Sequence, residues 1–129
     1  MAKRYAKIKT IILEITTGKA RRSGTDDQIV LQIGGHRWIL DKPKYDDFER
    51  GRTDIYELDV PLGMDASWFR FLCFQKKTQT GKDDDWQIEK IVLKINGKVV
   101  YEKADLDIWL KADRPRWCAH EFTYGKAGE

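Results

Sequence analysis

The chain has 129 residues, which is enough for one domain with a single hydrophobic core and too few for two independently stable domains. Charged residues make up 35% of it and apolar residues 41%, as is typical of a soluble globular protein and not of a disordered one. The 24 basic and 21 acidic residues leave a net charge of +3, too small for the strong field of a dedicated nucleic-acid binder. We therefore expect one domain over residues 1–129 and no nucleic-acid partner.

The N-terminal segment is basic, but it does not resemble a targeting sequence. Residues 1–9 carry four basic side chains, and the apolar run that follows is interrupted at Glu14. A secretory signal or a membrane span needs a longer apolar stretch. On this ground we expect a cytoplasmic location.

Short apolar runs separated by turn residues follow one another along the chain. Gly34-Gly35 and Asn96-Gly97 stand between pairs of such runs, where glycine or asparagine suits a tight hairpin turn. Residues 45–50 and 105–110 could each hold one helical turn, and no stretch sustains a helical repeat for longer. The pattern predicts an all-β antiparallel sandwich or barrel, with strands at residues 11–15, 29–33, 38–40, 55–60, 68–74, 86–95, 99–101 and 118–122.

The residues suited to catalysis are few. Cys73 and Cys118 lack the close spacing of a zinc site, so we expect reduced, buried thiols, with a disulfide as the alternative in an exported protein. His36 lies in a hairpin turn, where a solvated imidazole is the simpler interpretation. A hydrolase that uses Cys118 with His120 is the remaining alternative, but neighbours two apart on a strand rarely form such a dyad. We expect no enzyme.

Acidic residues collect in three predicted loops, at residues 24–27, around Asp41 and residues 46–47, and at residues 83–85. In an antiparallel sandwich the loops after the first, third and fifth strands emerge at the same end. Calcium binds six to eight oxygen atoms, which such loops could supply. The alternative is that these aspartates simply stabilise turns.

Several motifs along residues 7–122 occur in an order and spacing that resemble the PLAT, or lipoxygenase homology, domain. In addition to Trp86 at the start of the longest strand, they are Gly-Thr-Asp-Asp at 24–27, Leu-Asp-Lys-Pro at 40–43, Asp-Phe-Glu-Arg-Gly at 47–51, Thr-Asp-Ile-Tyr at 53–56, Asn-Gly-Lys-Val-Val at 96–100 and Asp-Ile-Trp-Leu at 107–110. The last two also look like the membrane-binding domain of clostridial-type phospholipase C toxins. The resemblance implies an eight-stranded sandwich of two four-stranded sheets.

The resemblance also implies a non-catalytic recognition module that docks on membranes or proteins, often with calcium. The calcium positions it suggests form three clusters: Thr25, Asp26, Asp46 and Asp47; the Gly24 carbonyl with Asp84 and Asp85; and Asp41 beside Asp47. Two residues depart from the family pattern, because Arg22 and Lys42 replace calcium ligands. We expect Arg22 to pair with the carboxylates of the second cluster and close it to calcium.

Membrane docking adds aromatic tips and basic side chains to such loops. The candidates are Trp38, Trp68 and Trp86 with Lys76, Lys77 and Lys82, although tryptophans buried in the core and a solvated basic rim are the simpler alternatives. Our leading hypothesis is a module that binds a membrane or lipid surface, with calcium as a possible cofactor. The alternative is a protein-interaction module that needs no calcium.

Overall fold

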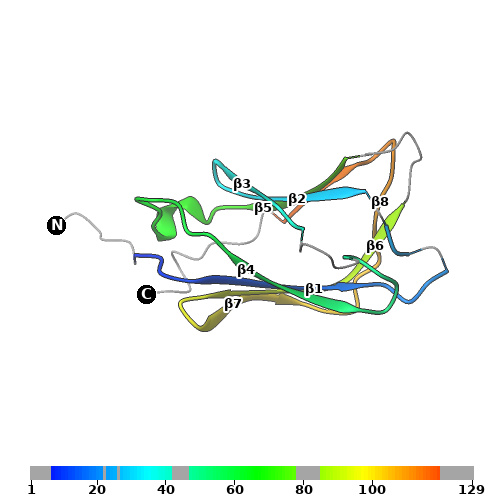
Figure 1. The fold of residues 1–129 in the computed structure, drawn as a ribbon, viewed down its shortest axis with the longest axis horizontal. Coiled ribbons are helices and arrows are strands. Elements are labelled where there is room, and N and C mark those ends of the chain that lie inside the picture. Colours follow the sequence, from blue (N-terminus) through cyan, green and yellow to red (C-terminus); the bar gives the residue numbers. More distant parts are fainter. Residues whose placement is uncertain (1–6, 22, 26, 42–46, 78–84, 120–129) are drawn as a thin grey trace.

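The structure, a computed structural model, describes residues 7–21, 23–25, 27–41, 47–77 and 85–119. These residues contain nine β-strands (Figure 1). The strands are β1 (Ile11–Thr17), β2 (Gln28–Ile33), β3 (His36–Ile39), β4 (Thr53–Leu58), β5 (Leu72–Lys77), β6 (Trp86–Ile95), β7 (Lys98–Lys103), β8 (Ile108–Leu110) and β9 (Arg116–Ala119), with a 3₁₀ turn, η1 (Ala66–Trp68), before β5. No helix in the described residues is long and apolar enough to cross a membrane.

The strands pair into two antiparallel sheets that face each other as layers of a β-sandwich (Figure 1). One sheet has the order β4-β1-β6-β7, with β8 also paired to β6, and the other has the order β3-β2-β5-β9. The predicted sandwich is therefore confirmed, with nine strands in place of eight. The additional strand is β8, which lies where the sequence allowed a helical turn and is held extended by its pairing with β6.

Alternating apolar residues fill the space between the sheets. Ile11, Leu13 and Ile15 of β1 are fully buried, and they lie opposite Ile95, Leu93 and Ile91 of β6 in the register. Side chains on a strand alternate between its two faces, so every second residue of each run points into the core. This period of two is the reason that the local pattern predicted the strands, whereas the sandwich was implied by the family resemblance.

The segment before β5 differs from the prediction. Residues 68–74 are strongly apolar and read as one strand, but β5 starts at Leu72, and a 3₁₀ turn ends at Trp68. Asp65 stabilises this turn, because its Oδ1 accepts a hydrogen bond of 2.9 Å from the Ser67 N–H and its carbonyl accepts one of 3.1 Å from the Trp68 N–H. The hydrogen bonds to Asp65 therefore favour a 3₁₀ turn at Trp68, although the apolar run predicted that the strand begins there.

Cys73 and Cys118 form a disulfide, so the prediction of reduced thiols is wrong. Cys73 on β5 lies directly opposite Cys118 on β9, with a Cα–Cα distance of 4.1 Å. The sequence separates the two residues by 45 positions, and only the pairing of β5 with β9 brings them together. Cys118 is therefore not available as a free nucleophile, and His120 lies outside the described residues.

Candidate functional site

Connections from distant parts of the sequence meet at one end of the sandwich, which we call the loop end; it lies on the right in Figure 1. The loop end comprises residues 18–27, 40–41, 47–52 and 111–115 together with Lys77 and Asp85, as far as the structure describes them. Backbone hydrogen bonds tie these segments together: Gly51 N to Gly18 O at 2.9 Å, Gln87 N to Ser23 O at 3.0 Å, Thr25 N to Phe48 O at 3.2 Å, and Lys76 N to Pro115 O at 2.8 Å.

The loop of residues 18–27 and the loop of residues 47–52 approach each other so closely that only glycine fits at position 24. A Cβ atom on Gly24 would lie 2.9 Å from the carbonyl oxygen of Phe48 and 3.1 Å from the backbone nitrogen of Arg50. Both atoms belong to the backbone and cannot rotate away. The Gly-Thr-Asp-Asp motif therefore has a packing role in addition to any ligand role.

A buried ion pair lies beneath these loops. Nζ of Lys76 is 2.8 Å from Oδ2 of Asp27, and the two side chains are only 1% and 2% exposed. Lys76 follows Leu72 and Phe74 in alternation on β5, so it occupies a core-facing position at the strand end. The expected place of Lys76 on an exposed basic rim is corrected: it is an internal cation that neutralises a loop carboxylate.

Two further carboxylates hold the 47–52 loop. Oδ2 of Asp54, which is 1% exposed, accepts a hydrogen bond of 2.8 Å from the Phe48 N–H. Oδ1 of Asp47 accepts one of 2.5 Å from the Tyr56 hydroxyl. Asp54 was not among the predicted residues, although it alternates in phase with the buried Tyr56.

A cluster of packed aromatic rings lies in the core beneath the loop end. Phe48 stacks with Tyr56 at a centroid distance of 5.9 Å and meets Trp86 edge to face at 4.9 Å. Trp86 is fully buried, and its Nε1–H donates to Oγ1 of Thr17 at 3.0 Å. Burying Phe48 anchors the middle of its loop, so the loop backbone is fixed where it meets Gly24.

The candidate tryptophans do not project from the loop end. Trp86 and Trp38 are buried, as in the simpler alternative, and Nε1–H of Trp38 donates to the Asp59 carbonyl at 2.8 Å. Trp68 is half-buried at the opposite end, where its carbonyl lies against Gly34 in the β2–β3 hairpin. A surface aromatic role is therefore not available to Trp86, and Trp38 and Trp68 lie away from the loops.

The candidate calcium ligands are only partly within the described residues. Thr25 is buried, and its Oγ1 accepts a hydrogen bond of 3.1 Å from the Asp27 N–H; Asp41 is exposed at the end of β3, and Asp85 is half-buried next to β6. Among the residues that the structure describes, no three histidine, cysteine, aspartate or glutamate side chains are grouped to hold a metal ion. Asp26, Asp46, Asp84, Lys82, Arg22 and Lys42 lie outside the described residues, so their roles stay predictions.

Basic side chains cover the outside of the loop end. Within the described residues, six of them are exposed there: Lys19, Arg21, Arg50, Arg52, Lys77 and Arg114. The acidic side chains exposed to the same degree in this part of the structure are Asp41 and Asp113. The described surface of the loop end is therefore basic, because Asp27 and Asp54 are buried beneath it.

The chain belongs to the PLAT/LH2 domain family, whose model matches residues 11–117. This assignment confirms the resemblance that the motifs suggested. The family, the sandwich and the converging loops together define the class of the chain as a PLAT-type β-sandwich, which related proteins carry as an accessory domain.

Known relatives contain this domain as one part of a longer chain. The chain is 29% identical over 115 residues to phospholipase C from Clostridium haemolyticum, covering 81% of this chain and 27% of that enzyme. It superposes on alpha toxin from Clostridium absonum with a TM-score of 0.78 and 22% identity, over 91% of this chain and 32% of the toxin. It also superposes on coral 8R-lipoxygenase, described as calcium-activated through a C2-like domain, with a TM-score of 0.66 and 19% identity, over 85% and 16% of the two chains.

Proposed function

We propose that this PLAT domain is a non-catalytic module that docks on anionic lipid surfaces through its loop end. The observation that carries the proposal is the set of six exposed basic side chains at that end, above the buried carboxylates of Asp27, which is paired with Lys76, and Asp54. Homology to the C-terminal domain of clostridial phospholipase C supports the same function. The basic surface and the family relationship therefore favour the same partner.

The charge at the loop end is large enough for reversible membrane binding. Each Lys or Arg near an anionic membrane contributes about 1 kcal/mol, so six contribute at most about 6 kcal/mol, which repulsion of the exposed Asp41 and Asp113 reduces. This upper limit corresponds to a dissociation constant no tighter than about tens of micromolar. Since the contribution is electrostatic, added salt weakens it.

We further propose that this docking does not require calcium. The described carboxylates fit a calcium site poorly, because Asp27 is paired with the Lys76 ammonium group and Asp54 and Asp47 accept hydrogen bonds that hold their loop. A calcium ion would have to displace a buried ammonium group to reach Asp27. The coral lipoxygenase, by contrast, is described as calcium-activated.

The non-catalytic part of the proposal is supported by two observations. The chain spans 27% and 32% of the length of the phospholipase and the toxin, and the catalytic domains of such enzymes lie in their other parts. Cys118, the candidate nucleophile, is held in a disulfide. A sulfur atom in a disulfide is not a thiolate and cannot act as a nucleophile toward a substrate.

Co-sedimentation with liposomes tests both parts of the proposal. We expect the domain to pellet with vesicles that contain phosphatidylserine and to stay in the supernatant with phosphatidylcholine alone. High salt should release it, because the attraction is screened. Chelating calcium with EDTA should leave the bound fraction unchanged.

Two other outcomes would each contradict a different part. Binding that disappears in EDTA and returns with calcium would contradict the proposal that docking does not require calcium. It would still support the proposal of a lipid partner. No pelleting on anionic vesicles, with or without calcium, would contradict lipid docking and favour a protein partner.

A further inference from the structure

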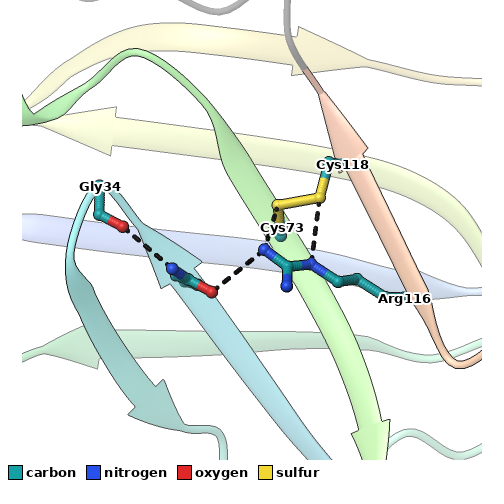
Figure 2. Close-up of a disulfide and its surroundings, with 5 residues drawn as sticks. Gly34, Cys73, Arg116 and Cys118 are labelled. Carbon is teal, nitrogen blue, oxygen red and sulfur yellow. Dashed lines mark hydrogen bonds between the residues drawn. A yellow bond between two sulfur atoms is a disulfide. The ribbon is translucent and has the colours of Figure 1, made fainter.

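An arginine lies across the disulfide on the outer face of the four-stranded sheet (Figure 2). Nε of Arg116 donates to Sγ of Cys118 and its Nη2 donates to Sγ of Cys73, both at 3.4 Å. One guanidinium group thus contacts both sulfur atoms. Cys118 and Arg116 alternate with the core-facing Trp117, which places them together on the outer face.

Hydrogen bonds from β2 hold the guanidinium group in this position. Its Nη2 donates to Oε1 of Gln32 at 3.3 Å, and Nε2 of Gln32 donates to the Gly34 carbonyl at 3.1 Å (Figure 2). Gln32 lies opposite Cys73 in the register of β2 and β5. The arrangement therefore spans three neighbouring strands, and the charge is oriented before any reaction starts.

A guanidinium group in this place stabilises reduced sulfur more than oxidised sulfur. The sulfur of a disulfide is a neutral, weak hydrogen-bond acceptor, whereas a thiolate carries a full negative charge. Arginine keeps its proton at all relevant pH values, so it stays a donor in both states. Its two hydrogen bonds are therefore stronger in the reduced state, where the sulfur atoms are thiolates, than in the disulfide. This difference favours thiolate formation.

The two cysteine residues differ in solvent exposure. Cys73 is 2% exposed, whereas Cys118 on the edge strand β9 is half-buried. An external thiolate therefore reaches Sγ of Cys118 first, and Cys73 is the leaving group.

We propose that Cys73, Cys118 and Arg116 form a thiol–disulfide exchange site that takes a thiol reductant as its ligand. A thiolate of an external dithiol bonds to Sγ of Cys118; the S–S bond breaks, and its electron pair leaves on Cys73, where Nη2 of Arg116 stabilises it. The second thiolate of the dithiol then attacks the mixed disulfide, and Cys118 leaves as a thiolate beside Nε of Arg116. The dithiol becomes a disulfide, the protein gains two electrons, and the dithiol's protons pass to the solvent or the two cysteines.

Exchange at this site would change how β9 is attached. The disulfide is the covalent link between β5 and β9, and the segment just before β9 supports the loop end through the hydrogen bond from Lys76 N to Pro115 O. Reduction therefore loosens a strand that leads directly into the loop end. The exchange chemistry itself does not depend on lipid binding.

Equilibration with mixtures of reduced and oxidised dithiothreitol tests the role of Arg116. We expect the equilibrium constant for reduction to fall on the order of tenfold in Arg116→Gln, which removes the charge. Arg116→Lys should restore most of the loss, and Arg70→Gln, which removes an exposed charge three residues before Cys73, should match the wild type. Equal constants in the wild type and Arg116→Gln would overturn the proposal, as would a protein isolated without reductant that carries two free thiols.

Mapping the first adduct tests which sulfur is attacked. The folded protein is treated briefly with the monothiol β-mercaptoethanol, free thiols are alkylated, and the tryptic peptides are analysed by mass spectrometry. We expect the mercaptoethanol adduct on Cys118 and the alkyl group on Cys73. An adduct found equally on both cysteines, or mainly on Cys73, would contradict the assignment of Cys118 as the entry point.

Discussion

Replacing Lys76 by methionine is expected to lower the free energy of unfolding by about 3 to 5 kcal/mol, because it leaves the Asp27 carboxylate buried without its counter-charge. For a domain of this size the melting temperature should fall by more than about 10 °C. Methionine has a similar length, so loss of packing contributes little. Urea and thermal unfolding of the wild type and the variant measure the effect.

A matched substitution on the other sheet separates burial from charge. Lys94 pairs with Glu14 at 2.7 Å, but these side chains are 37% and 25% exposed. Lys94→Met should therefore change the stability by less than about 1 kcal/mol. The double variant Asp27→Leu with Lys76→Met should recover much of the lost stability, since no buried charge of the pair remains. A Lys76→Met protein as stable as Lys94→Met would show that the pair has no structural role.

Neutralising three basic residues of the loop end should weaken binding to anionic vesicles about a hundredfold. Each charge contributes about 1 kcal/mol near an anionic surface, and about 1.4 kcal/mol corresponds to a factor of ten. The triple variant Lys19→Gln, Arg21→Gln, Arg50→Gln changes exposed side chains and no core residue. Its partition coefficient is measured by co-sedimentation over a range of lipid concentrations.

The control for this variant carries the same charge change at the opposite end of the sandwich. Lys9, Arg70 and Lys98 are exposed there, near the β6–β7 turn and the η1 turn. Replacing all three by glutamine should reduce binding far less than the loop-end variant. Equal losses in the two variants would mean that the net charge of the domain, and not the loop end, determines binding.

The strands could be predicted because their pattern is local. Alternating apolar residues such as Ile11, Leu13 and Ile15 indicate directly which face of a strand is buried. Glycine or asparagine indicates a tight turn, as at Gly97, which has a φ of 79°. β8 was missed because its three residues are too few for a period to be visible. Pairing with β6 decided its conformation.

The residues under the loops were missed for a different reason. Lys76 and Asp54 are charged, and a charged residue near a strand end is usually assigned to the surface. Their phase was nonetheless visible, since Lys76 alternates with Leu72 and Phe74, and Asp54 with Tyr56. Alternation could have predicted that both point inward, but it could not have supplied the partner that makes burial tolerable.

The amino-acid pattern alone was sufficient to predict an all-β antiparallel sandwich or barrel and the order of the acidic and basic loops, because each depends on neighbours along the chain. The sandwich itself was implied by the family resemblance of the motifs. Only the tertiary structure decided that Lys76 meets Asp27, that Cys73 meets Cys118 and that Arg116 lies over both sulfur atoms. These partners are 49, 45 and up to 43 positions apart. Contacts at such separations are set by strand order and register across a sheet, and no periodicity within a single strand encodes them.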